Sequence, residues 1–127
     1  MHASLALKLL LVATGGAIGS LIRYLLESHI NASVITAVIN TLGSFLMGMF
    51  TGWLLASAMA QDKKMLLSAL LMSGFCGGFS TFAHFATITM NYLRDGAIYA
   101  GIGYIFITIV AGLVFCFGGF LIGTRLV

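Results

Sequence analysis

The sequence has no proline and very few charged residues. Of its 127 residues, six are Lys or Arg and three are Asp or Glu, which is 7% charged against 61% apolar. A soluble domain carries roughly a quarter charged residues, so this chain could not cover its surface with polar groups. That excludes a soluble enzyme. The six basic residues are scattered and form no patch, so no nucleic-acid partner is expected.

Clusters that carry catalysis or redox chemistry are also missing from the sequence. Its two cysteines, Cys76 and Cys116, lie far apart in apolar stretches and form no CxxC or Cys/His cluster. They are interpreted as unreactive buried thiols. No Ser/His/Asp arrangement is evident either, so the chain is not expected to be an enzyme.

The few charges divide the chain into long uncharged stretches, residues 9–22, 28–61, 65–93 and 96–124. A hydrocarbon core of about 30 Å needs about 20 residues of helix, and the first stretch reaches that length if Lys8 snorkels. We therefore predict an all-α integral membrane protein. Its single transmembrane domain, residues 1–127, has helices near 4–26, 33–57, 65–92 and 97–124. The first is expected to be a retained helix, not a cleaved signal peptide.

Loop charge sets the orientation of membrane helices, and here its signal is weak. One side carries Lys8, Lys63, Lys64 and Arg125, and the other carries Arg23 and Arg94. Two interpretations stay open: a mildly biased single topology, or insertion both ways up to give an antiparallel dimer. Four helices enclose little space, so a passage for solute favours an oligomer in either case.

Glycine is the most informative residue inside the spans. Small residues four apart let membrane helices pack closely, and Gly15/Gly19, Gly48/Gly52 and Gly119/Gly123 show this spacing on three different spans. Residues 73–82 of the third span combine three glycines with three hydroxyl side chains. With no proline to bend it, a helix there breaks at glycine or polar residues, and the freed carbonyls can bind a cation. A third helix broken near its middle is favoured over an intact one that uses glycine for packing.

Two polar residues stand on small-residue faces of the first two spans. Arg23 follows Gly15 and Gly19 at helical spacing, so all three share one helix face. On that face its side chain either lines water or meets a partner group. The alternative is that it snorkels to the membrane interface and pairs with Glu27. Asn40 lies three and four residues before a glycine and a serine. Its uncharged amide either lines a pore as a hydrogen-bond donor or bonds another helix.

The third and fourth spans carry two further stripes at helical spacing. Phe75, Phe79, Phe82 and Phe85 form an aromatic stripe; such a stripe usually packs, yet a ring edge is positive and can meet a small anion. His84 beside it either titrates near neutral pH or only forms a hydrogen bond. Tyr104, Thr108, Gly112 and Cys116 form a weakly polar stripe that is either a wall of the same passage or a packing groove.

No carboxylate lies in any span core, since Glu27 is at a helix end and Asp62 and Asp95 are in loops. A small proton-coupled or cationic-drug transporter needs an intramembrane carboxylate. The neutral donors and basic groups instead suit an anion.

Residues 15–24, 40–48 and 74–82 resemble the Fluc (CrcB) family of fluoride channels, and the length and layout of the whole chain agree. The resemblance implies an antiparallel, dual-topology homodimer with two pores. It implies passive, fluoride-selective export from a microbial cytoplasm across the cell (inner) membrane. The alternatives are a small dual-topology cation or drug antiporter, and a non-transporting accessory membrane protein.

The resemblance also implies roles for particular residues. Asn40 would supply a pore-lining amide, and Phe82 and Phe85 the ring pair whose edges contact the ion. Ser80 and Thr81 would line the pore beside them, and Tyr104 and Thr108 would begin a polar track. Arg23 would lie near a wet vestibule. The backbone carbonyls of Gly77 and Ser80 would bind a structural Na⁺ at the dimer axis.

The chain departs from the family pattern at four positions. The family commonly reads Ser-Thr-Phe-Ser-Thr-Phe where residues 80–85 read Ser-Thr-Phe-Ala-His-Phe, so Ala83 and His84 replace two hydroxyls. Gly112 and Cys116 stand where further hydroxyls of the polar track are expected.

Overall fold

The computed structural model describes residues 3–127, and its described residues contain helices and no strands. The first two spans are α1 (Leu5–Glu27) and α2 (Ala32–Ala56), and the last is α6 (Ile98–Thr124). The third span comprises α3 (Gln61–Leu67), the π-helical η1 (Ser68–Cys76), α4 (Gly77–Phe79) and α5 (Phe82–Arg94). Within residues 3–127, four helical segments are long and apolar enough to cross a membrane. The prediction of four membrane-spanning helices is confirmed.

Polar side chains cap the N-termini of three of these helices. The Ser4 hydroxyl accepts a hydrogen bond from Leu7 N at 3.2 Å, and Asn31 Oδ1 accepts from Ser33 N at 3.1 Å. Such caps satisfy backbone N–H groups that have no partner inside the helix. Thr81 caps α5 in the same way, so that helix begins at the break and not at a loop.

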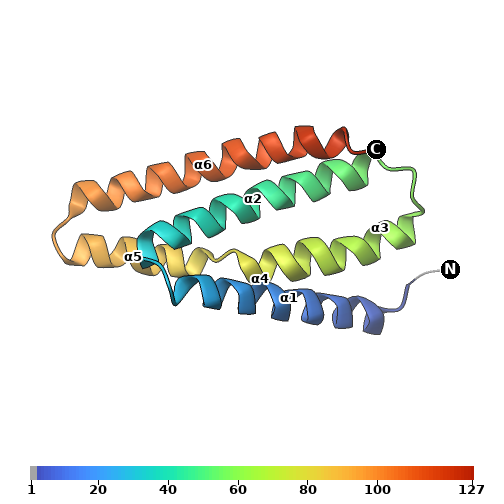
Figure 1. Cartoon of the computed structure of the whole chain (residues 1–127), viewed down its shortest axis with the longest axis horizontal. Coiled ribbons are helices and arrows are strands. Elements are labelled where there is room, and N and C mark those ends of the chain that lie inside the picture. Colours follow the sequence, from blue (N-terminus) through green and yellow to red (C-terminus); the bar gives the residue numbers. More distant parts are fainter. Residues whose placement is uncertain (1–2) are drawn as a thin grey trace.

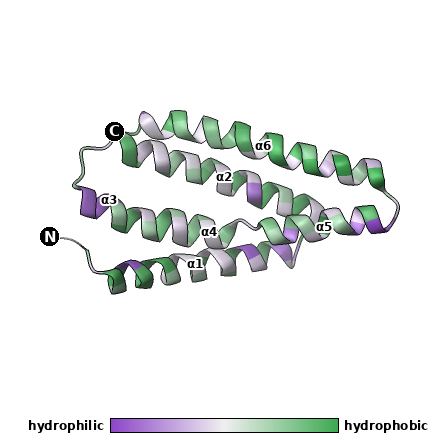
Figure 2. Cartoon of the chain, turned by 180° about the vertical axis from the view of Figure 1, so that it is seen from behind, coloured by the Kyte–Doolittle hydropathy of each residue, from purple (hydrophilic) through white to green (hydrophobic). Residues whose placement is uncertain are grey.

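The helices form two pairs of parallel neighbours (Figure 1). In one pair α1 packs along η1 and α4, and in the other α2 packs along α6. The start of α1, the end of α6 and the α2–α3 connection lie at one end of the bundle (Figure 1), as an even number of spans requires. Apolar residues run along α6. Hydrophilic residues lie at the start of α3 and at the end of α5, among other places (Figure 2).

All three predicted glycine pairs are buried at these helix contacts. A Cβ on Gly15 would lie 2.9 Å from Phe75 N, and one on Gly123 would lie 2.9 Å from Trp53 N. Backbone therefore meets backbone in both pairs, which only glycine permits.

The third span is bent near its middle, as predicted, but its glycines do not make the break. Ser80 and Thr81 are extended, with φ/ψ of −82°/156° and −149°/114°. Gly74 and Gly78 stay helical and pack against α1, where a Cβ on Gly74 would lie 3.1 Å from Gly15 Cα. The favoured prediction of a broken third helix is confirmed and the alternative of an intact helix is wrong, although Gly74 and Gly78 do serve close packing.

The break also divides the aromatic stripe, which is a correction to the sequence analysis. Phe75 and Phe79 stack at a centroid distance of 5.7 Å, and Phe79 belongs to a core cluster with Ile35 and Ile39. Phe82 and Phe85 form a separate tilted pair at 5.5 Å. Helical spacing cannot carry across two extended residues, so the four rings are two pairs and not one stripe.

Candidate functional site: a groove at the break in the third span

Asn40 of α2 holds the extended residue Thr81 by its backbone. Its Oδ1 accepts from Thr81 N–H at 2.7 Å, and its Nδ2 donates to the Thr81 carbonyl at 3.0 Å. The side-chain amide thus replaces helical partners that the break removes. The hypothesis of an interhelical hydrogen bond is confirmed. An amide nitrogen carries two hydrogens, so one N–H remains for a further acceptor.

A groove of about 390 Å³ opens beside this contact. Six of the seven residues predicted to line the pore lie along it: Asn40, Ser80, Thr81, Phe82, Phe85 and Thr108. Tyr104, the seventh, lies behind the groove, where its ring stacks on Phe85 at 5.7 Å. Gly112 and Cys116 also line the groove, so the fourth-span stripe forms one of its walls. Residues from three separate spans thus meet in one place.

The two rings of the groove differ sharply in exposure. Phe85 is 7% exposed, whereas Phe82 is 78% exposed. Phe85 is fixed by Tyr104, whose hydroxyl donates to the Ser33 carbonyl at 3.0 Å. One ring of the pair is therefore held by the chain itself, and the other has most of its surface free for a lipid, an ion or another protein copy.

The hydroxyl groups around the groove have different partners. Ser80 Oγ donates to the Cys76 carbonyl at 2.8 Å, and Thr81 Oγ1 accepts from His84 N at 3.2 Å, so both serve the backbone of the break. Thr108 Oγ1 is buried and has no hydrogen-bond partner within residues 3–127. Of these three, Thr108 carries the hydroxyl without a partner among the described residues, and its oxygen is enclosed by the protein at the wall of the groove.

At the break, two backbone N–H groups no longer donate to the carbonyls that they would bond in a helix. In a continuous α-helix the Gly77 carbonyl would accept from Thr81 N–H and the Ser80 carbonyl from His84 N–H. Here Thr81 N–H donates to Asn40, and His84 N–H donates to Thr81 Oγ1. These two carbonyls, predicted to bind Na⁺, thus lose their helical donors. Across the described chain no three His, Cys, Asp or Glu side chains cluster for a metal ion, so a cation site here would use backbone oxygens.

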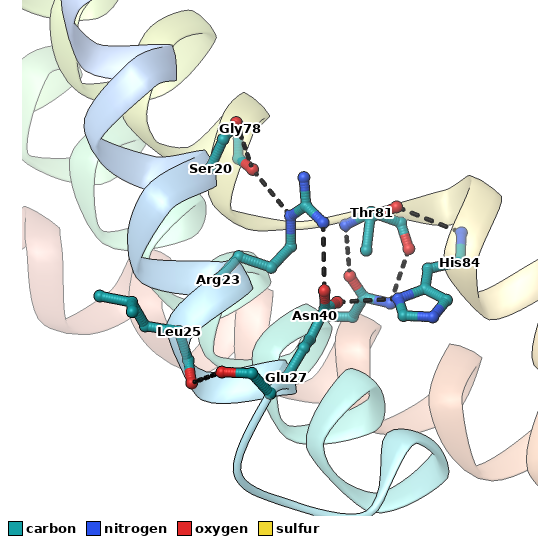
Figure 3. Close-up of polar contacts among 9 residues, drawn as sticks. Ser20, Arg23, Leu25, Glu27, Asn40, Gly78, Thr81 and His84 are labelled. Carbon is teal, nitrogen blue, oxygen red and sulfur yellow. Dashed lines mark hydrogen bonds and ion pairs between the residues drawn. The ribbon is translucent and has the colours of Figure 1, made fainter.

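Arg23 makes both of the contacts considered for it. Its Nε donates to the Gly78 carbonyl at 3.1 Å, and its Nη1 lies 3.4 Å from Glu27 Oε2 (Figure 3). The same Gly78 carbonyl accepts from Ser20 Oγ at 3.3 Å. Arg23 is not among the residues along the groove, and its side chain is 26% exposed.

Two residues of the site were not selected from the sequence. Ser44 lines the groove one helical turn after Asn40 and donates to the Asn40 carbonyl at 2.7 Å; its spacing from Asn40 was the available signal. Glu27 Oε1 lies 2.8 Å from His84 Nδ1, although 57 positions separate the two residues. No sequence pattern marks that pair.

Comparison with known proteins decides the family. The family model described as "CrcB-like protein, Camphor Resistance (CrcB)" matches residues 10–120, which is most of the chain. The chain belongs to the CrcB family. The resemblance seen in the three sequence segments is thereby confirmed.

Curated relatives agree along nearly the whole length of this CrcB-family chain. A protein of Leptospira interrogans named "Fluoride-specific ion channel FluC" is 39% identical over 88% of this chain and 91% of its own length. "Fluoride-specific ion channel FluC 2" of Bacillus licheniformis is 38% identical over 90% and 85%. A FluC protein of Thermus thermophilus is 34% identical over 94% and 96%. With its four apolar spans, the chain is a multi-pass membrane protein.

Proposed function

We propose that this protein is a fluoride-selective channel, and not an enzyme, that lets fluoride leave the cytoplasm passively across the inner cell membrane. The groove at the break carries the proposal, because it gathers Asn40, Thr108 and both rings of the Phe82/Phe85 pair beside the extended segment. The curated relatives named for fluoride support it.

The chemistry of the groove suits a small, strongly hydrated anion. Passage through a narrow pore requires close donors that replace water. The free N–H of Asn40 and the positive ring edges of the Phe82/Phe85 pair can supply these donors. A cation fixed in mid-pore would hold the anion too firmly, whereas neutral donors let it leave.

We further propose that the functional unit is an antiparallel, dual-topology homodimer with two pores in the lipid membrane. The groove is open along one side, and Phe82 at its edge is 78% exposed, so a second copy would close it. The weak charge difference between the two loop sides supports insertion both ways up. A single added cysteine in the α2–α3 connection, labelled from either side of a vesicle, would react from both sides; labelling from one side alone would exclude dual topology.

A structural Na⁺ completes the proposed assembly. The Gly77 and Ser80 carbonyls lose their helical donors at the break, and carbonyls of unwound membrane helices are typical Na⁺ ligands. Bound there, the ion would neutralise the carbonyl dipoles and hold two breaks together at the dimer axis.

Efflux from liposomes tests the channel directly. Purified protein in vesicles loaded with potassium fluoride should release fluoride rapidly once valinomycin carries the balancing potassium, as read by a fluoride electrode. Potassium chloride vesicles should release little. Fluoride efflux no faster than from protein-free vesicles would overturn the proposal, and proton-coupled cation uptake would favour the antiporter. Absence of any flux would favour an accessory membrane protein.

A further inference from the structure

The first helix holds the third span on both sides of its break. Before the break, Arg23 Nε donates to the Gly78 carbonyl at 3.1 Å. After the break, Glu27 Oε1 lies 2.8 Å from His84 Nδ1, in the first turn of α5. Arg23 and Glu27 are one helical turn apart and lie 3.4 Å from each other, so the contacts form one connected chain of polar groups (Figure 3).

The Glu27 carboxylate is the centre of this cluster. Its side chain is only 12% exposed, and its two oxygens serve different partners, Oε2 towards Arg23 and Oε1 towards His84. A carboxylate removed from water is costly unless charged or hydrogen-bonding partners compensate it. Since an ionised carboxylate only accepts hydrogen bonds, the imidazole must donate from Nδ1.

The position of His84 connects this contact to the groove. His84 lies directly before Phe85 and two residues after Phe82, within the same short turn of α5. Its backbone N–H also donates to Thr81 Oγ1, beside the Asn40 contact. A ring that holds the first turn of α5 against α1 therefore also sets where the two phenylalanine rings stand.

We propose that Glu27 and His84 are positioning residues for conduction, joined across α1 and α5 by one hydrogen bond that fixes the Phe82/Phe85 pair relative to Asn40. This inference rests on the proposed channel function. It also gives a role to the residue at which this chain departs from the family pattern. A threonine at position 84 would be too short to reach the Glu27 carboxylate, whereas the His84 imidazole reaches it. Neither residue needs to touch the ion.

A double-mutant cycle on fluoride efflux tests the inference. His84→Ala and Glu27→Ala should each lower efflux by about threefold to tenfold, the scale of one partly exposed hydrogen bond to a charged group. The double variant should be no slower than the slower single variant, because one contact is lost in all three. His84→Gln, which keeps a donor, should restore more than half of the wild-type rate.

His29 provides the matched control. It lies in the α1–α2 connection, and the hydrogen bonds of its ring go only to Ser28 and Leu25 among the described residues, so His29→Ala should conduct like the wild type. Wild-type efflux from both alanine variants would overturn the inference. So would a double variant whose loss equals the product of the single losses.

A spectroscopic measurement keeps the test decisive if an alanine variant fails to yield monodisperse protein. In ¹⁵N-histidine NMR, the His84 signal, assigned by its loss in His84→Gln, should show a protonated, hydrogen-bonded Nδ1 that shifts in Glu27→Gln. An unchanged His84 signal would contradict the contact. This measurement does not depend on transport, so an inactive wild type would overturn the channel proposal while the contact is judged separately.

Discussion

Asn40 and Thr81 are joined by a reciprocal pair of hydrogen bonds, at 2.7 Å and 3.0 Å, across the break in the third span. One side chain thereby satisfies both backbone groups of an extended residue at membrane depth, where no bulk water is available. The same amide lies along the groove with a second N–H to spare. Asn40 thus has a structural role that the coordinates show and a conducting role that we propose.

Asn40→Asp is expected to reduce fluoride efflux by at least about tenfold, since it removes the amide donor and places a carboxylate where an anion must pass. The acceptor for Thr81 N–H is kept, but the second carboxylate oxygen faces the Thr81 carbonyl that Asn40 Nδ2 now bonds, so the variant should also have a lower melting temperature. Efflux from liposomes measures the effect. Asn91→Asp, on α5 and away from the groove, is the matched control and should conduct normally. Normal efflux from Asn40→Asp would remove Asn40 from the pore.

Phe82→Ile and Phe85→Ile should each lower fluoride efflux, by roughly tenfold, because an aliphatic side chain has no positive edge to offer an anion. The two variants differ in their effect on stability. Phe85 is 7% exposed and stacks on Tyr104 within the chain, so its replacement should lower the melting temperature more than replacement of Phe82, which is 78% exposed and can lose contacts only with the second copy of the proposed dimer. Phe106→Ile, on an exposed part of α6, is the control. Equal efflux from all three would refute the ring-edge contact.

Adjacent glycines of α6 provide a test of the close helix packing. A Cβ on Gly119 would lie 3.0 Å from the Phe45 carbonyl carbon and 3.1 Å from Met49 N, whereas one on Gly118 would have nothing within 4 Å. Gly119→Ala should therefore destabilise the α2–α6 pair by about 1–3 kcal/mol. Gly118→Ala should be neutral or slightly stabilising. Thermal unfolding in detergent measures both, and equal melting temperatures would contradict the packing.

Removal of sodium should abolish fluoride efflux if the Gly77 and Ser80 carbonyls hold the proposed ion. After dialysis against a sodium-free buffer, the protein should show no fluoride efflux in the liposome assay. Efflux should return when sodium is added. Ser80→Ala should leave this dependence unchanged, because the Ser80 hydroxyl bonds the Cys76 carbonyl and the proposed ligand is backbone. Full efflux in sodium-free buffer would contradict the sodium site.

Much of the candidate site could be predicted from residue types in apolar context. An amide such as Asn40 or a cluster of hydroxyls is rare enough inside a span to be noticed without coordinates, and the groove contains most of the residues so chosen. The aromatic stripe was wrong as a single feature, because helical spacing fails where Ser80 and Thr81 are extended. The break itself was predicted within the correct ten residues, at glycine or polar residues, and it falls at the polar residues Ser80 and Thr81.

Composition alone places this protein in lipid, since nine charged residues in 127 cannot solvate a folded surface and their spacing leaves four spans. Glycine spacing also predicted three pairs at helix contacts, because small side chains let backbones approach, whereas the contact of Gly74 and Gly78 with α1 emerges only in the packed bundle. Which polar groups meet across the bundle is visible only in the folded chain. Asn40 bonds Thr81, which lies 41 positions further along the chain, and Glu27 contacts His84, which lies 57 positions further along. Such pairings follow from how the two helix pairs dock, a property of the packed bundle that no local spacing encodes.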